Sequence, residues 1–124
     1  MAYIPPDAKW FIPDLVVEYK IYSGISNDNM IHVNTVLVEA NSAEVAYAKA
    51  LELGHTYEVN YTNSDGNKVE VKFRGLRDLN VIHDELEHGA ELFYESHESL
   101  KEDEIQALVH PKRELAIFRP REED

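Results

Sequence analysis

The chain has 124 residues, the length of one ordinary domain and too short for two. Apolar residues make up 44% of it and charged residues 29%, a composition typical of a globular protein that buries a core. The absence of cysteine excludes disulfides, thiolate nucleophiles and cysteine-ligated metal centres. Twelve basic residues against 24 acidic ones give a net charge of −12, which argues against binding to nucleic acid or to an anionic membrane surface.

The pattern of the N-terminal residues does not predict a secretory signal. Residues 1–8 include Pro5 and Pro6, which predict an extended segment because proline fixes φ and restricts the residue before it. No basic stretch followed by an apolar run is present, and no apolar run approaches the roughly 20 residues that span a bilayer. We therefore expect a soluble cytoplasmic protein.

Two strands are predicted after this segment. Apolar residues alternate over Leu15–Tyr22, the period of a half-buried strand, and Pro13 places its start at a sheet edge or a bulge. The polar run Ser23–Asn29 predicts a loop. Residues 31–40 predict a second strand, and apolar side chains on both of its faces favour a place near the sheet centre.

A helix is predicted next. Ser42 is a capping residue, and Glu44 adds an acid to the first turn. Apolar residues then recur at helical spacing and predict the buried side: Ala43, Ala46, Tyr47, Ala50 and Leu51. Gly54 is predicted to end the helix as a left-handed cap. The small alanines indicate close packing on a sheet.

A β-hairpin follows the helix. Alternating apolar residues predict strands over 57–61 and 69–73, with turn residues at 63–66.

The next region has two interpretations. Residues 76–84 predict a strand, 85–89 its turn and 90–96 a partner strand. The apolar residues of 79–93 also fit a loose helical spacing. We favour the strands because this stretch contains glycine and other weak helix formers.

The C-terminal region predicts one more helix and one more strand. Ser99 and Glu102 form a capping box, the apolar stripe continues to Val109, and Pro111 ends the helix. Residues 115–118 predict a short strand, and residues 119–124 a polar tail.

The predicted order is therefore β-β-α-β-β-β-β-α-β, which we interpret as a single α+β domain over residues 1–124. Hairpin connections predict one mostly antiparallel sheet, with two helices packed on one face.

No common catalytic or phosphate-binding motif is present, and no cofactor is predicted. One cluster concentrates possible ligands of a divalent metal, namely His83, Asp84 and His88. Their spacing is not specific, because five residues on a helix place the two imidazoles about 140° apart. A solvated acidic turn is the simpler interpretation.

A second cluster pairs two arginines with an acid: Arg74, Arg77 and Asp78. Guanidinium groups bind small anions and carboxylates bidentately, so a ligand site is one interpretation. The other is a charged strand connection whose arginines pair with nearby carboxylates, and we prefer it. An enzyme or small-ligand site would combine this cluster with His83 and Asp84 in one pocket.

The acidity is concentrated in residues 83–104, hereafter the acidic segment, which holds nine acids and one base, a net −8 of the total −12. The simplest interpretation is a solvated surface. The functional one is a docking surface for a basic protein partner, because complementary fields accelerate association. The candidate contact residues are Glu87, Glu91, Phe93, Glu95 and Glu98. Homodimerisation through an exposed strand edge is compatible with it.

Three stretches carry a family resemblance: Ala8–Phe11, Phe73–Leu92 and Pro111–Phe118. Together they resemble small bacterial proteins of the domain of unknown function 4288 family. The resemblance implies a bacterial, soluble, stand-alone domain, and it implies no activity. We therefore predict a non-enzymatic binding or regulatory protein, with the enzyme or small-ligand site as the alternative.

Overall fold

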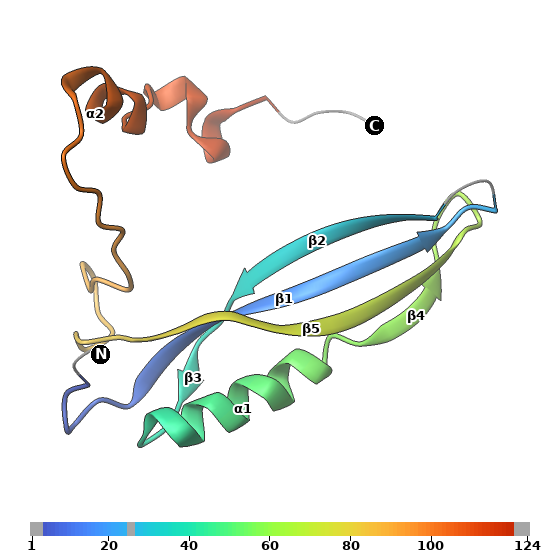
Figure 1. Ribbon diagram of the computed structural model, residues 1–124, viewed down its shortest axis with the longest axis horizontal. Helices are drawn as coiled ribbons and strands as arrows, with labels where there is room; N and C mark the ends of the chain where they lie inside the picture. Colours follow the sequence, from blue (N-terminus) through green and yellow to red (C-terminus); the bar gives the residue numbers. More distant parts are fainter. Residues whose placement is uncertain (1–3, 25–26, 121–124) are drawn as a thin grey trace. The chain divides into compact units, whose positions relative to one another are not determined.

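The computed structural model describes residues 4–24 and 27–120, which form a larger unit ending at Phe93 and a smaller one beginning at Tyr94. The larger unit contains β1 (Trp10–Tyr22), β2 (Asn27–Thr35), β3 (Val38–Glu39), α1 (Ala43–His55), β4 (Val59–Thr62) and β5 (Lys68–Val81) (Figure 1). The smaller unit contains α2 (Glu102–Leu108) and two short 3-10 helices, η1 (Lys112–Glu114) and η2 (Ala116–Phe118).

One antiparallel sheet forms the larger unit. Its strand order is β2-β1-β5-β4, and β3 pairs with the first residues of β1. The two longest strands, β1 and β5, therefore lie at the centre (Figure 1). The predicted α+β class and mostly antiparallel sheet are confirmed.

Helix α1 packs on one face of this sheet. Its buried residues are all small, Ala46, Ala50 and Gly54. Small residues let the helix axis approach the strands closely. Two core clusters result: Phe11, Val38, Ala40 and Ala46 form one, and Leu15, Val17, Val69 and Val71 form the other. The prediction of the buried face was correct for Ala46 and Ala50, whereas Tyr47, predicted to be buried, is exposed.

The local signals of the first helix and the hairpin are confirmed. Ser42 Oγ accepts a hydrogen bond from the Val45 N–H at 3.2 Å, as an N-cap should. In the turn between β4 and β5, Asn63 Oδ1 accepts from the N–H groups of Asp65 and Asn67 at 3.0 and 2.9 Å.

Gly54 does not have its predicted role. Helix α1 continues to His55, so Gly54 lies inside the helix and is not a left-handed cap. A Cβ at this position would overlap the ring of Phe73 on β5. Glycine is needed here because of close packing, which depends on a residue 19 positions away.

The second predicted strand is also corrected. Residues 31–40 do not form one central strand, because β2 ends at Thr35 and β3 begins at Val38. β2 is an edge strand, and it begins at Asn27, inside the predicted loop, of which residues 25 and 26 lie outside the described ranges.

Pro13 explains the break between β2 and β3. It lies inside β1, which begins at Trp10, and not at the start of the strand. Its carbonyl accepts from the Val36 N–H at 3.3 Å, where the pairing passes from β2 to β3. Proline lacks an N–H, so a gap in the neighbouring ladder is where a central strand tolerates it.

The strand interpretation of residues 76–96 was right as far as Val81 and for a turn near Glu87, where the Ala90 N–H donates to the Glu87 carbonyl, but wrong for the partner strand 90–96. The helical alternative over 79–93 was wrong. β5 runs through Gly75 to Val81 without interruption, because β1 offers it a partner as far as Phe11. Residues 85–89 and 90–96 form neither a strand nor a helix. The strand predicted over residues 76–84 is thus the end of β5. The partner strand predicted over residues 90–96 is not formed in the described part of the chain.

The smaller unit departs from prediction at both ends. Ser99 has a φ of 58°, so α2 begins later, at Glu102. Glu104 Oε1 accepts from the Lys101 N–H at 3.2 Å and replaces the predicted capping pair. Residues 116–118 form a 3-10 turn and not a strand. Within the larger unit, helix α1 contacts β1, β3 and β5 of the sheet.

The N-terminal segment is not extended throughout. The Ala8 N–H donates to the Pro5 carbonyl at 3.0 Å, which closes a turn. Residues 1–3, and residues 121–124 of the predicted tail, lie outside the described ranges. No helix in the described part of the chain is long and apolar enough to cross a membrane.

Candidate functional site

Two β-bulges position the arginines of the 74–78 cluster. Asp14 of β1 pairs with Asp78 of β5, but the next residue of β1, Leu15, pairs with Leu76. Arg77 is therefore an extra residue in β5. In the same way, Val16 pairs with Gly75 and Val17 with Phe73, so Arg74 is a second extra residue in β5. Gly75, with a φ of 129°, provides the backbone conformation between them. A bulge re-aims its side chain, and here both arginines meet carboxylates of β1.

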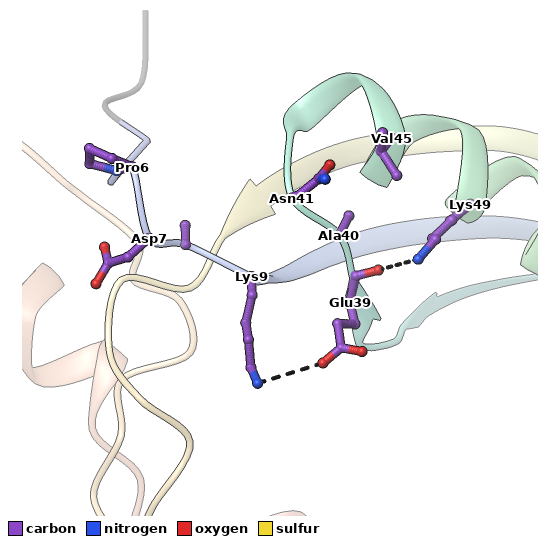
Figure 2. A pocket seen from close by; sticks show the side chains of 9 residues that line it. Pro6, Asp7, Lys9, Glu39, Ala40, Asn41, Val45 and Lys49 are labelled. Carbon is purple, nitrogen blue, oxygen red and sulfur yellow. Dashed lines mark hydrogen bonds and ion pairs between the residues drawn. The ribbon is translucent and has the colours of Figure 1, made fainter.

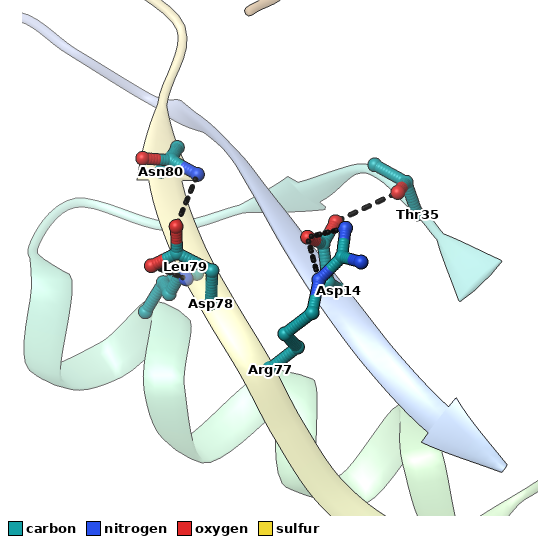
Figure 3. Close-up of polar contacts among 6 residues, drawn as sticks. All are labelled: Asp14, Thr35, Arg77, Asp78, Leu79 and Asn80. Carbon is teal, nitrogen blue, oxygen red and sulfur yellow. Dashed lines mark hydrogen bonds and ion pairs between the residues drawn. The ribbon is translucent and has the colours of Figure 1, made fainter. Parts of the chain in front are cut away.

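Arg77 pairs with Asp14. Its Nη2 and Nε lie 2.9 and 3.2 Å from Asp14 Oδ2, while Thr35 Oγ1 donates to Oδ1 at 2.7 Å (Figure 3). The aspartate therefore joins β2, β1 and β5. Asp78 is not part of this pair, since its oxygens accept from the Leu79 N–H and from Asn80 Nδ2.

Arg74 pairs with Glu18. Its Nη1 lies 2.6 Å from Glu18 Oε1, and Asn29 Nδ2 donates to Oε2 at 3.0 Å. The Glu18 side chain is only 8% exposed. The hydrogen bond from Asn29 and then that from Arg74 lower the pKa of this carboxyl below its usual 4.5, and they outweigh burial, which acts in the opposite direction.

This geometry favours the structural interpretation of the arginine cluster. Both guanidinium groups bind carboxylates of their own sheet, and every buried side-chain nitrogen or oxygen in the described residues has a partner. The cluster ties β5 to β1 across two irregular steps of the ladder. Arg74, Arg77 and Asp78 stay ligand candidates from the sequence alone.

The histidine cluster lies elsewhere. His83 and Asp84 line a hollow of about 420 Å³ together with Trp10, Ile82 and Leu86, and His88 is not among its lining residues. Within residues 4–24 and 27–120, no three histidine or acidic side chains come together as a metal site would require. The five residues of the enzyme alternative are therefore divided between the sheet and this hollow.

A second hollow, of about 550 Å³, lies beside the start of α1 (Figure 2). Two lysines border it. Lys49 Nζ donates to the Glu39 carbonyl at 2.7 Å, and Lys9 Nζ lies 3.7 Å from the Glu39 carboxylate. Both cations thus already contact the same residue, Glu39.

The acidic segment presents its side chains to solvent. Glu87, Glu91, Phe93, Glu95 and Glu98 are all exposed, as the docking prediction needs. A turn precedes Glu91, in which the Ala90 N–H donates to the Glu87 carbonyl at 3.0 Å, and Asp84 Oδ2 accepts the Glu91 N–H at 3.1 Å.

Sequence reasoning missed two neighbours of Phe93. A strand would have placed Leu92 and Tyr94 on the opposite face. In the irregular backbone all three are exposed, and Phe93 and Tyr94 keep 55% and 70% of their surface in solvent. The available signal was three consecutive apolar residues flanked by acids, with no periodicity to bury them.

Comparison with known families gives one match. Residues 10–94, more than half of the chain, match the domain of unknown function 4288 (DUF4288). The chain belongs to the DUF4288 family. Searches of curated proteins and of solved structures found no match.

The DUF4288 region coincides closely with the larger unit. It begins at the first residue of β1, includes the complete sheet and α1, and ends at Tyr94. Both bulged ion pairs and the exposed apolar triplet 92–94 lie inside it. Glu95 and Glu98 follow it.

Proposed function

We propose that this DUF4288 protein is a non-enzymatic protein-binding module, and that its acidic segment binds a basic surface of a protein partner. The observation that carries the proposal is the exposure of Leu92, Phe93 and Tyr94 next to one another in an acidic, irregular stretch. Adjacent exposed apolar side chains with a polar rim are typical of interaction sites.

The apolar and acidic residues have separate roles in this proposal. Burial of an aromatic side chain such as Phe93 contributes about 1.5–3 kcal/mol to binding. The net −8 of the segment attracts a basic partner over distance and raises the association rate, with a smaller effect on the lifetime of the complex. Binding is therefore expected to weaken as salt is added.

The alternative, a small-ligand or metal site, has less support. Its arginines pair with Asp14 and Glu18, and its histidines and arginines do not share one hollow. Nothing in the geometry favours it over a binding surface.

The test is quantitative affinity capture from a bacterial lysate. The bait carries Phe93→Ala and Tyr94→Ala in one variant, and Gln in place of Glu91, Glu95 and Glu98 in a second. The matched control neutralises three exposed acids elsewhere, at Glu44, Glu52 and Asp65. Circular dichroism confirms that each bait is folded.

A partner that supports the proposal is basic, is retained by the wild type and by the control, and is lost by both test variants. The charge variant should mainly slow association, whereas the aromatic variant should mainly speed dissociation. Equal capture by all four baits, or no specific partner, would show that the segment is a solvated surface.

A further inference from the structure

The outer edge of β2 presents unpaired backbone groups. β2 pairs with β1, and no other strand of the described residues pairs with it. The Val36 N–H donates to Pro13, so by alternation the N–H and C=O groups of Thr35, Val33 and Ile31 point away from β1.

Apolar side chains border this edge on both faces of the sheet. Ile31 and Val33 lie opposite Glu18 and Val16 of β1, on the face away from α1, and Ile31 is 50% exposed. Met30 is exposed on the other face. Apolar side chains on both faces predicted a strand at the centre of the sheet, but they belong to β2, which has a neighbouring strand on one side.

The edge lacks the features that prevent edge-to-edge pairing. Asp28, near the start of β2, is the one charged residue of the strand, and residues 29–37 contain no Lys, Arg, Asp or Glu and no proline or glycine. The register between β1 and β2 has no bulge. Natural edge strands are usually short, charged, bulged or covered. The opposite edge follows this rule, because β4 has only four residues.

We propose that β2 pairs antiparallel with β2 of a second copy, so that two sheets become one continuous sheet. A second copy fits this edge because an antiparallel edge is complementary to itself about a two-fold axis. Charge points to the same place. Two chains of net charge −12 repel each other, and residues 29–37 of this edge add no charge to that repulsion.

Backbone substitution tests this pairing directly. Val33→Pro removes an N–H that points outward, which an edge strand tolerates, so the fold should persist while the dimer weakens by at least about tenfold. Val33→Thr keeps the N–H and the branched side chain and serves as the control. Sedimentation equilibrium measures the dimer as twice the chain mass of 14.3 kDa.

A side-chain pair provides the second test. Ile31→Lys places a charge on the β2 edge and should abolish the dimer. Val59→Lys makes the matched change on the opposite edge, at a side chain that is 54% exposed, and should leave the dimer intact.

Hydrogen exchange on the unmodified protein covers the case in which a variant fails to fold. In the dimer the amides of Ile31 and Val33 become protected as concentration rises, whereas those of His32 and Asn34, which face β1, are protected throughout.

Salt distinguishes this proposal from binding through the acidic segment. Added salt screens repulsion between two acidic copies and should strengthen the dimer, whereas it should weaken a complex with a basic partner. A chain that stays monomeric at all concentrations, or a dimer that Val33→Pro and Ile31→Lys leave unchanged, would overturn the proposal.

Discussion

Glu18 lies in the central strand β1 with its carboxylate covered by polar side chains from both neighbouring strands. Asn29 of β2 and Arg74 of β5 each donate to one of its oxygens. The covering groups are polar neighbours at the sheet surface and not the apolar core, so the carboxylate stays charged. Its pKa is lowered first by the Asn29 hydrogen bond and next by that of Arg74.

This lowered pKa makes stability depend on pH. A carboxyl whose pKa is lower in the folded state stabilises the fold above its unfolded pKa, and this contribution is lost as pH falls through the folded pKa. Glu18→Gln should therefore be less stable than the wild type at neutral pH, and should lose less stability as the pH falls below the usual carboxyl pKa of 4.5. Urea unfolding at a series of pH values measures both effects.

The control for this measurement is Glu52→Gln, which removes one exposed carboxylate from α1. It should keep the pH dependence of the wild type. If Glu18→Gln shows the same acid sensitivity as the wild type, the Asn29–Glu18–Arg74 contact does not stabilise the charged form.

At the scale of elements, the approach of α1 to β5 depends on one glycine. Gly54 lies against the Phe73 ring, and His55 packs edge-on to that ring at 5.1 Å between centroids. Moving the ring would therefore disturb both elements.

Gly54→Ala sets two effects against each other. Alanine is better than glycine inside a helix by about 1 kcal/mol. Overlap with a packed ring costs about 1–3 kcal/mol, so we expect a net loss of up to about 2 kcal/mol in the free energy of unfolding. Chemical denaturation measures it. In a Phe73→Leu background, where the ring is absent, the same change should become neutral or stabilising, and equal losses in both backgrounds would contradict the packing explanation.

Prediction at this scale succeeded where neighbours in sequence decide the structure. The Ser42 cap and the Asn63 turn use bonds that reach at most four residues along the chain. It failed where the partner is distant. The bulges that aim Arg74 and Arg77 follow from pairing with β1, about 60 residues earlier, and no local pattern encodes that register.

At the scale of the molecule, both core clusters lie between Phe11 and Val81. No residue described between Tyr94 and Pro120 is buried. The folded core and the acidic segment are thus largely separable in sequence.

A chain that ends at Glu98 should therefore fold as the full chain does. We expect its free energy of unfolding to change by less than about 0.5 kcal/mol, because no described residue from 99 to 120 belongs to either core cluster. Ending the chain at Asp78 should unfold it, because Leu79 and Val81 pack against the cluster around Phe11. Denaturation followed by circular dichroism compares the three chains, and loss of cooperative unfolding at the first truncation would contradict this division.

The candidate binding site was predictable in position and only partly in detail. Composition alone located the acidic segment, because charge can be counted without a fold. The joint exposure of Leu92, Phe93 and Tyr94 was not predictable, since it depends on the absence of a partner strand for residues 90–96.

The sequence by itself determined the α+β class, the helix that begins after Ser42, the hairpin around Asn63 and the location of the charge. These depend on local propensity, periodicity and composition. Tertiary structure alone decided that β2 is an edge, that β5 continues to Val81 and that both arginines of the cluster meet carboxylates of β1. The physical reason is that strand order and register depend on which distant segments pair, and the same alternating pattern suits a central strand and an edge.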